Sequence, residues 1–391
     1  MSKYNKVIIY WDYYQAYHCA RVAAVMKSDI VSSSNISAVS LYFNGADHHL
    51  SEIDELIRRD VIFIGETNAG ALNKCFHIIR FLKLLNVIKP NVIFTPGYSG
   101  VYAWISLCWA KIYNSTTCIM FETQYNDFKR QYYKEIIKKI LIGMYDLGFA
   151  GGATHLEYLN KLGMRIDRIV TGYDSVNNEY YSNIKHDTVS SLESWRKRLN
   201  IEKSFFLSIG RMIPKKGFNN LLKAYKIYLS ICERNCICPY DLIIIGDGPE
   251  RNNIAKEIAS ASISNYVIMP GYLTSDITSR YLSMASVFIM PSIYAEQWGL
   301  VINEAMAAGV PVIASNICGA THDLIEDGIT GFTYEPMDVN TLANIMYKLS
   351  IDEELRIRIA KAGRERVDKY SVENFAIQFS KIITMANDIN S

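Results

Sequence analysis

Short apolar segments alternate with longer segments of helical periodicity through the first half of the chain. The apolar segments are rich in β-branched and aromatic residues, and the segments that follow place apolar residues three or four positions apart. This alternation predicts repeated βα units and therefore a parallel sheet. We predict strands at 6–11, 38–43, 60–64, 91–95, 118–121 and 168–170, and helices at 17–26, 73–86 and 134–144.

The alternation stops around residues 174–194 and then begins again. Asn, Ser, Asp and Tyr predominate in this segment, which predicts a connection between two domains. Beyond residue 352 the pattern is helical and ends in a long helix at 371–388. The second series predicts strands at 205–209, 241–245, 266–269, 287–290 and 311–314, and helices at 218–231 and 252–259.

The predicted fold class is α/β, with two tandem Rossmann-like domains whose parallel sheets face a central cleft. A chain of 391 residues exceeds one ordinary core, which agrees with two domains. We place the N-terminal domain at 1–185 and the C-terminal domain at 186–368. The remaining residues, 369–391, form a helix that is long enough to cross back to the N-terminal domain.

Composition and charge narrow the classes of function. Half of the residues are hydrophobic, as in a folded enzyme, and the formal charge of +2 offers no general attraction for nucleic acid. The apolar run at 7–11 is too short for a signal peptide, and the run at 101–110 is too short to span a membrane, so we expect a cytoplasmic protein. Eight cysteines include Cys232, Cys236 and Cys238, but no second cluster or nearby His completes a metal site.

Two acidic residues, Glu296 and Glu304, flank the turn that follows strand 287–290. Leu300 and Val301 begin a helical stripe, so Glu296 lies in the turn and Glu304 in the first turns of the helix. Ligands of open α/β sheets bind at this edge. Two carboxylates held there suit a hydroxyl-rich ligand such as a sugar or a ribose. The alternative for either acid alone is a solvated surface carboxylate.

Two cationic residues, Arg211 and Lys216, lie between Gly210 and Gly217, where strand 205–209 leads into a helix. Backbone N–H groups at such a position favour an anion. Arg211 offers a guanidinium fork for phosphate oxygens and Lys216 a movable point charge. The pair predicts a pyrophosphate site that needs no metal, and the alternative is a charged helix entry that serves only solubility.

A Gly-x-Gly turn at Gly246 and Gly248 follows strand 241–245. Glycines at a strand end let the backbone approach a ligand. The third glycine of a dinucleotide fingerprint is absent, however, and Pro249 lies in the way. The turn therefore predicts a tight bend at the edge of a site and argues against NAD.

These motifs, in this order and spacing between residues 205 and about 335, resemble glycosyltransferase family 4, a retaining family with the GT-B architecture. The resemblance implies that 186–368 binds the nucleotide sugar and that 1–185 lies on the acceptor side. Arg211 and Lys216 would hold the donor diphosphate, Glu304 the ribose hydroxyls and Glu296 the transferred sugar. The implied donor site comprises Gly210, Arg211, Lys216, Gly246, Gly248, Met269, Gly271, Leu273, Glu296, Gly299, Leu300, Val301 and Glu304.

The N-terminal half lacks the glycine-rich first turn of many family members. A Tyr-His-x-x-Arg pattern from Tyr17 to Arg21 is similar to one branch of the family, which makes His18 a catalytic candidate beside Arg211, Lys216 and Glu296. The alternative is a buried structural histidine. Polar residues that follow strands 91–95 and 118–121 face the same edge, and the acceptor candidates among them are Tyr98, Ser99, Glu122 and Asp127.

The segment 129–141 mixes cations, tyrosines and β-branched apolar residues. On a helix, this mixture resembles an interfacial anchor for anionic lipid. The alternative is an ordinary surface helix with its apolar side on the sheet.

The predicted function is transfer of a sugar, with retention, from a nucleoside diphosphate to a hydroxyl of a glycan or polyprenyl-linked acceptor in cell-surface polysaccharide synthesis. No cofactor, metal or nucleic acid is expected, and the predicted location is the cytoplasm, at the inner face of the cell membrane. A nucleotide-sugar epimerase of the same fold and a non-catalytic GT-B partner subunit remain alternatives. A dehydrogenase is opposed by the missing three-glycine turn.

Overall fold

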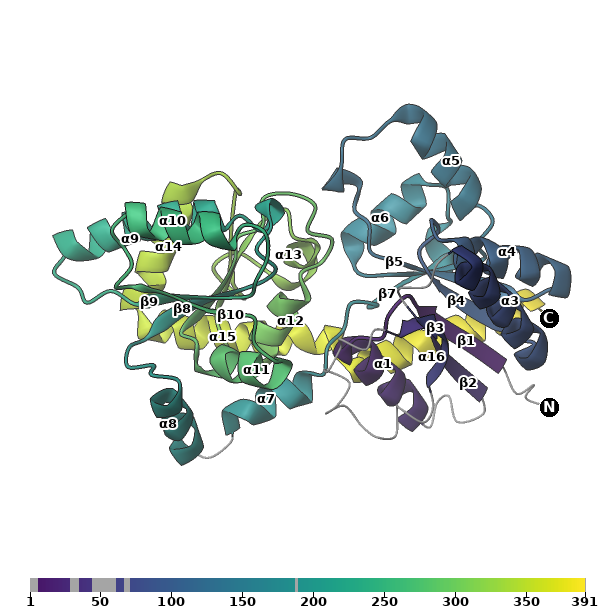
Figure 1. Ribbon diagram of the computed structural model, residues 1–391, viewed down its shortest axis with the longest axis horizontal. Coiled ribbons are helices and arrows are strands. Elements are labelled where there is room, and N and C mark those ends of the chain that lie inside the picture. Colours follow the sequence, from purple (N-terminus) through teal and green to yellow (C-terminus); the bar gives the residue numbers. More distant parts are fainter. Residues whose placement is uncertain (1–5, 29–34, 44–60, 67–70, 187–188, 391) are drawn as a thin grey trace. The chain divides into compact units, whose positions relative to one another are not determined.

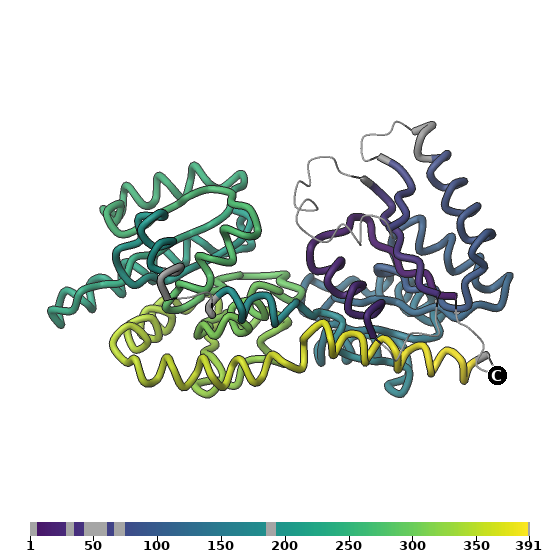
Figure 2. The backbone as a smooth tube through the Cα atoms, turned by 90° about the horizontal axis from the view of Figure 1, so that it is seen from below, coloured from purple at the N-terminus to yellow at the C-terminus, as the bar shows by residue number. Residues whose placement is uncertain are grey.

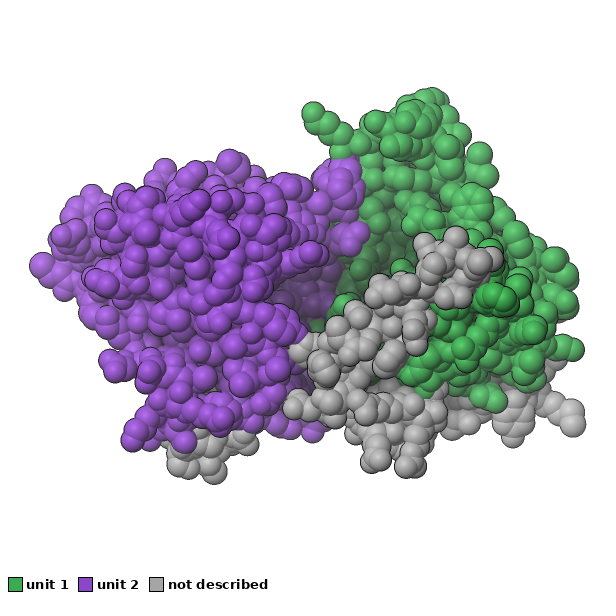
Figure 3. All heavy atoms as spheres, in the orientation of Figure 1, with its two compact units in different colours: residues 1–125, 129–176, 370–391 green, residues 126–128, 177–369 purple. Residues whose placement is uncertain are grey.

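The computed structural model describes residues 6–28, 35–43, 61–66, 71–186 and 189–390. The chain forms two compact units, which Figure 3 shows in different colours. The first contains residues 1–125, 129–176 and 370–391, and the second contains 126–128 and 177–369.

The first unit contains a parallel sheet with the strand order β3-β2-β1-β4-β5-β6-β7 among the described residues (Figure 1). Its central strands are buried apolar runs, as expected for a parallel sheet covered on both faces. In the central pair, Val7 of β1 lies opposite Val92 of β4. The strands are β1 (Lys6–Trp11), β2 (Asn35–Phe43), β3 (Val61–Glu66), β4 (Val92–Pro96), β5 (Thr116–Phe121), β6 (Leu147–Ala150) and β7 (Ile169–Thr171).

The C-terminal helix packs against this sheet, as predicted. Phe375, Phe379 and Ile382 lie in one buried cluster with the strands, and the Phe379 ring stacks on Phe94 with the ring centroids 4.5 Å apart. In Figure 2 this helix runs beside the first helix of the chain. The helices of the first unit are α1 (Ala16–Lys27), α3 (Ala71–Ile88), α4 (Val101–Tyr113), α5 (Tyr132–Ile142), α6 (Ala153–Lys161) and α16 (Val372–Asn390).

The second unit repeats the same plan with the strand order β10-β9-β8-β11-β12-β13, all pairs being parallel. Its strands are β8 (Phe205–Ile209), β9 (Asp241–Ile245), β10 (Val267–Gly271), β11 (Val287–Met290), β12 (Val312–Ser315) and β13 (Phe332–Tyr334). Its helices are α7 (Asn178–His186), α8 (Val189–Arg198), α9 (Phe218–Arg234), α10 (Arg251–Ser260), α11 (Ser275–Met284), α12 (Leu300–Ala307), α13 (Gly319–Leu324), α14 (Val339–Ile351) and α15 (Glu353–Val367).

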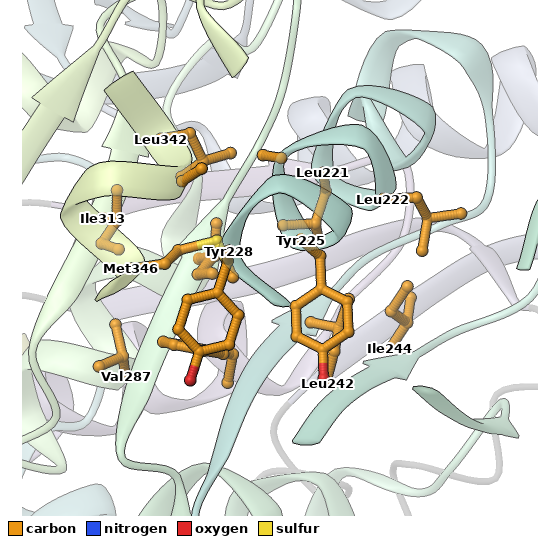
Figure 4. Packing of buried hydrophobic residues seen from close by; sticks show 14 of the residues in the cluster. Leu221, Leu222, Tyr225, Tyr228, Leu242, Ile244, Val287, Ile313, Leu342 and Met346 are labelled. Carbon is orange, nitrogen blue, oxygen red and sulfur yellow. The ribbon is translucent and has the colours of Figure 1, made fainter. Parts of the chain in front are cut away.

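The core of the second unit forms where α9 covers the sheet. Leu221 and Tyr225 lie over Leu242 and Ile244 of β9 (Figure 4). The Tyr225 hydroxyl donates to the carbonyl oxygen of Tyr240 at 2.7 Å, so the buried ring keeps a partner for its polar end. This packing holds the sheet whose edge carries the predicted donor site.

Two predicted features differ in detail from the structure. The segment predicted as an irregular connection contains α7 and α8, although residues 187–188 lie outside the described residues. Polar helices of this kind are stabilised mainly by packing, here of α7 on α12 and α11, which periodicity does not reveal. The predicted strand 60–64 corresponds to β3, and its first residue, Asp60, also lies outside the described residues.

Within the described ranges, no helix combines the length and the apolar character that crossing a membrane requires.

Candidate functional site

The strand order of the second sheet reverses between β8 and β11, which pair in parallel. Doubly wound sheets bind ligands at the carboxyl ends of the strands beside such a switch point. The loops that leave these two strands are hydrogen-bonded to each other, because the Ile293 amide donates to the Lys215 carbonyl oxygen at 2.8 Å. The sheet therefore brings residues 210–217 next to residues 291–299.

An ion pair joins these two loops. The Lys216 ammonium donates to Glu296 Oε2 at 2.7 Å, and the Ser292 hydroxyl donates to the same oxygen at 2.8 Å. Only 15% of the Lys216 side chain and 9% of the Glu296 side chain are exposed, so water screens the pair weakly. The two predicted site residues are thus in direct contact at the switch point.

The backbone around Glu296 is held from several sides. Ser315 Oγ donates to the Ser292 carbonyl at 2.6 Å, Lys215 Nζ donates to the Ala295 carbonyl at 3.0 Å, and the Gly319 amide donates to the Glu296 carbonyl at 3.2 Å. A carboxylate on so constrained a loop points in a defined direction without a ligand, which is what preorganised recognition requires.

Arg211 differs from Lys216 because its side chain is exposed. Among the described residues it makes no hydrogen bond or ion pair. Its loop is nevertheless anchored, since the Gly210 amide donates to the Ile245 carbonyl at 3.0 Å and the Met212 amide to the Asp247 carbonyl at 2.8 Å. A free guanidinium on an anchored loop is available to an anionic ligand.

The glycine turn after β9 packs against this loop without room for side chains. Gly246 has a φ of +137°, and a Cβ there would collide with the Gly210 carbonyl oxygen. A Cβ at Gly248 would lie 2.5 Å from the Met212 carbonyl oxygen. Both glycines are therefore needed to let the loops that follow β8 and β9 approach each other.

Glu304 lies half-buried on α12 and is hydrogen-bonded to the Tyr181 hydroxyl from α7. Burial raises the pKa of Glu304 to about 7, although the Tyr181 hydrogen bond acts in the opposite direction. The carboxyl group is therefore close to half-protonated near neutral pH. The helix that carries Glu304 begins after Gly299, whose left-handed φ of +97° turns the chain into Leu300 and Val301.

Arg251 of α10 lies beside the end of β10 and the residues that follow it, which include the predicted donor-site residues Met269, Gly271 and Leu273. A Cβ on Gly271 would lie 2.9 Å from Arg251 Nη1, and Arg251 Nη1 lies 3.8 Å from Asp247 Oδ2. Met269 and Leu273 on either side are half-buried. The segment thus combines partly apolar side chains with one cation.

In the first unit, His18 is buried and its ring stacks on Trp11 with the ring centroids 4.4 Å apart. Its Nδ1 lies 3.1 Å from the Tyr13 carbonyl oxygen and 3.2 Å from the Gln15 amide. Burial, and then the charge of Arg21, hold the pKa of His18 well below its usual value. The ring is therefore neutral near pH 7, and its catalytic role stays a prediction.

A buried acid pair lies at the carboxyl edge of the first sheet. Glu122 follows β5, Asp174 follows β7, and their side chains are hydrogen-bonded to each other. Arg21 Nη2 lies 3.4 Å from Asp174 Oδ1, and Arg21 Nε donates to the Ser175 carbonyl at 2.9 Å. Burial raises the pKa of both acids, and the negative charge of Glu122 raises that of Asp174 further. Burial therefore opposes the ionisation of both acids at once, beside a fully buried arginine.

The remaining acceptor candidates differ in accessibility. Ser99 is exposed, Tyr98 is half-buried and Asp127 is buried. Tyr98 and Ser99 belong to the first unit together with Glu122, whereas Asp127 is grouped with the second unit. Their role in binding an acceptor stays a prediction.

Comparison with known proteins finds a family match within the second unit. Residues 191–366 match the family described as glycosyl transferases group 1. The predicted resemblance to glycosyltransferases of the GT-B architecture is thereby confirmed, and the paired Lys216 and Glu296 lie within the glycosyl transferases group 1 segment.

Relatives and solved structures extend this finding. The capsular polysaccharide biosynthesis glycosyltransferase CapM of Staphylococcus aureus is 32% identical over 200 residues, which cover 51% of this chain and 50% of CapM. The chain spans half or less of the length of the first curated relatives it matches.

Two solved structures align with the whole chain. A glycosyltransferase from Rickettsia africae ESF-5 aligns over 100% of both chains with a TM-score of 0.76 at 22% identity. HepE of Anabaena, solved with UDP and glucose, covers 98% of this chain and 100% of its own with a TM-score of 0.75 at 16% identity. At these identities the likeness shows the GT-B fold.

Several residues that contact the predicted site residues carried no usable sequence signal. Tyr181 lies in the segment predicted as a connection, and Ser292 and Arg251 lie inside recognised motifs without an assigned role. Asp174 in the first unit is also in the predicted connection. Only the tertiary structure shows which groups these side chains contact. Within the described residues, no group of three or more His, Cys, Asp or Glu side chains could hold a metal ion.

Proposed function

We propose that this chain is a retaining, metal-independent glycosyltransferase of family 4 that moves a sugar from a nucleoside diphosphate to a hydroxyl of a glycan or lipid-linked acceptor. The observation that carries the proposal is the contact between Lys216 and Glu296 at the switch point of a segment that matches glycosyl transferases group 1, with the exposed Arg211 on the adjoining loop. A cation and a carboxylate side by side suit a ligand that joins a diphosphate to a sugar.

The two cations act on the leaving group. When the bond between the anomeric carbon and the diphosphate oxygen breaks, negative charge grows on the leaving diphosphate and positive charge on the sugar ring. Lys216 and Arg211 stabilise this developing charge more than they stabilise the ground state, which lowers the barrier. Together they offset the charge that a divalent metal would otherwise neutralise.

The two glutamates act on hydroxyl groups. Glu296 accepts hydroxyl donors from the transferred sugar while Lys216 and Ser292 hold its other oxygen, and Glu304 accepts the ribose hydroxyls. Because Glu296 is already engaged by two donors, it is a poor covalent nucleophile. We therefore favour attack by the acceptor hydroxyl on the face that the diphosphate leaves, with the acceptor proton passing to a diphosphate oxygen, which retains the anomeric configuration.

The acceptor belongs to the first unit in this proposal. Glu122, which is half-buried beside the fully buried Asp174, can accept a hydrogen bond from an acceptor hydroxyl. The name of CapM places that relative in capsular polysaccharide synthesis, and we propose a similar role in cell-surface polysaccharide synthesis. The enzyme would act in the cytoplasm, in peripheral contact with the inner face of the cell membrane.

A binding experiment tests the donor site. Isothermal titration of the full chain with UDP, GDP, ADP and dTDP, with and without EDTA, should reveal at least one ligand whose affinity is unaffected by EDTA. Arg211→Ala and Lys216→Ala should each weaken that ligand by about ten- to a hundredfold, since each removes a charge-assisted contact.

Lys223→Ala, at an exposed lysine of α9, is the matched control and should bind as the wild type does. If no nucleoside diphosphate binds, the proposed donor class is wrong. If both site variants bind normally, the donor site does not include Arg211 and Lys216. Once a nucleotide is known, its sugar derivatives incubated without acceptor separate a transferase from an epimerase, because only the epimerase converts the donor alone.

A further inference from the structure

Helix α5 turns its apolar side away from the protein. In Figure 1 it projects next to α6 at the margin of the first unit. Five large apolar or aromatic side chains form its outward face, which we call the α5 face. They are Tyr132, Tyr133, Ile136, Ile137 and Ile140, exposed by 84%, 60%, 42%, 52% and 64%.

Two polar side chains of α5, Glu135 and Lys138, point inward instead. Lys138 Nζ lies 2.7 Å from Glu135 Oε1, and the Tyr158 hydroxyl of α6 donates to Glu135 Oε2 at 2.9 Å. Arg130, just before the helix, lies 3.9 Å from the same carboxylate and 4.4 Å from the centre of the Tyr158 ring. This network attaches α5 to the first unit through charges and hydrogen bonds.

This arrangement reverses the usual one. A helix on a globular protein normally buries its apolar stripe and exposes its charges. The alternative expected from the sequence, a surface helix with its apolar side on the sheet, is therefore wrong for α5: only Ile142 of its apolar residues is buried. An exposed apolar surface of this size indicates a partner.

The charges around the α5 face indicate what the partner is. With about 100° between successive helical residues, the face covers the sector from Tyr132 to Ile137, and Lys134 and Lys139 border it on opposite sides. Both lysines are exposed. The single acid of the helix, Glu135, is turned inward, so the exposed surface of α5 carries only positive charge.

We propose that the α5 face docks on an anionic lipid bilayer, with its isoleucines among the upper acyl chains and Lys134 and Lys139 on lipid phosphates. Tyrosines such as Tyr132 and Tyr133 favour the interface between acyl chains and headgroups. Apolar burial and cation attraction act together in such interfacial helices. The proposal rests on the proposed function only in that a lipid-linked acceptor would make the bilayer the site of reaction.

Co-sedimentation with vesicles tests the proposal on the full chain without any nucleotide. Vesicles of phosphatidylcholine with phosphatidylglycerol should bind the protein, and binding should weaken when salt rises from roughly 0.05 M to 0.5 M. Ile136→Gln/Ile140→Gln should weaken binding at least about tenfold, since an isoleucine that leaves the acyl region loses most of its transfer free energy. Lys134→Gln/Lys139→Gln should weaken it roughly thirtyfold on anionic vesicles, at about fivefold per cation.

Matched variants control for general surface effects. Ile351→Gln/Ile357→Gln removes two isoleucines of similar exposure, 50% and 62%, from α14 and α15, and should bind vesicles as the wild type does. Lys223→Gln/Lys226→Gln does the same for charge on α9. All variants should bind nucleoside diphosphates normally, so a failed donor experiment and a failed vesicle experiment are distinguishable.

The proposal is overturned if the wild type does not bind anionic vesicles or if both α5 variants bind as well as their controls. It is also overturned if sedimentation shows self-association that Ile136→Gln/Ile140→Gln abolishes while vesicles capture no protein. In that case the α5 face is an interface between copies of this chain.

Discussion

Replacement of Lys216 by methionine is the most direct test of how the donor site is built. Methionine keeps the approximate length of the lysine stem but removes the ammonium group that donates to Glu296 at 2.7 Å. Glu296 would keep the hydrogen bond from the Ser292 hydroxyl to Oε2 but would lose its contact with the ammonium group. Because the Glu296 side chain is only 9% exposed, water restores little of the lost solvation.

The expected magnitude follows from this geometry. At 2.7 Å and an effective dielectric constant of about 20, the attraction between the unit charges is about 6 kcal/mol, and the desolvation of both groups offsets most of it. We expect Lys216→Met to lower the free energy of unfolding by about 2 kcal/mol and Glu296→Gln by about 1 kcal/mol. The double variant should lose only about 1.5 kcal/mol, which gives a coupling of about 1.5 kcal/mol, inside the range for side chains in contact.

Hydrogen exchange measures these changes in stability for individual segments. A local measurement is needed because a chain with two units need not unfold in one step. Amide protection in β8 and β11 should fall in Lys216→Met, and largely recover in the double variant. Lys223→Met on α9 is the control and should stay within about 0.5 kcal/mol of the wild type. A coupling free energy within about 0.3 kcal/mol of zero, or an unchanged diphosphate affinity in Lys216→Met, would refute the reasoning.

Four further predictions concern other parts of the molecule. Under the proposed role of Glu304 in binding ribose hydroxyls, nucleoside diphosphate affinity should fall as the pH drops through about 7, because a protonated carboxyl group accepts hydrogen bonds more weakly than a carboxylate does. In titrations at several pH values, Glu304→Gln should flatten this dependence and Tyr181→Phe should move its midpoint upward. Because the pKa of Glu304 in the folded protein exceeds its ordinary 4.5, its stabilising contribution is complete below about pH 4.5 and is lost as the pH rises through about 7. Thermal unfolding of Glu304→Gln at several pH values should lack that loss. Arg21→Met should lower the free energy of urea unfolding by about 3 kcal/mol, because Asp174 loses its buried ion pair. The double variant Arg21→Met/Asp174→Leu should recover most of this loss in stability. Equal losses in both variants would contradict this account. Gly246→Ala should lower the free energy of urea unfolding by about 2 kcal/mol, because the φ of +137° and a collision with a backbone carbonyl oxygen both oppose a Cβ. An unchanged urea midpoint would show that an alanine fits this turn without strain.

The strands were largely predictable from apolar pattern. The predicted bounds 6–11, 205–209, 241–245 and 287–290 coincide with β1, β8, β9 and β11. Central parallel strands are buried on both faces, so they read as uninterrupted apolar runs that end at polar or glycine residues. Two short strands, β6 (Leu147–Ala150) and β13 (Phe332–Tyr334), were not predicted, because three or four residues give only a weak apolar pattern.

Helices that depend on packing were less predictable. The segment around α7 reads as a polar connection, yet it forms a helix that packs on α12 and supplies Tyr181 to Glu304. Its helicity comes from contacts with residues more than a hundred positions away, which local periodicity does not contain.

The loops of the donor site could be placed from sequence because each follows a predicted strand of one parallel sheet. Arg211, Lys216 and Glu296 were therefore expected at the same edge. Which side chains touch was not determined in this way, since Lys216 and Glu296 are 80 positions apart and meet only because β8 and β11 are neighbours. Strand order is a property of the whole sheet, and no single motif encodes it.

Helix α5 shows most clearly which properties follow from the sequence and which follow from the tertiary structure. The sequence by itself predicted a helix at 134–144 that mixes apolar and charged residues, and the structure places this helix at Tyr132–Ile142. It did not determine which side faces the protein. Only the tertiary structure decided this, by supplying Tyr158 and Arg130 as partners for Glu135 and Lys138, so that the polar side packs inward and the apolar side faces out.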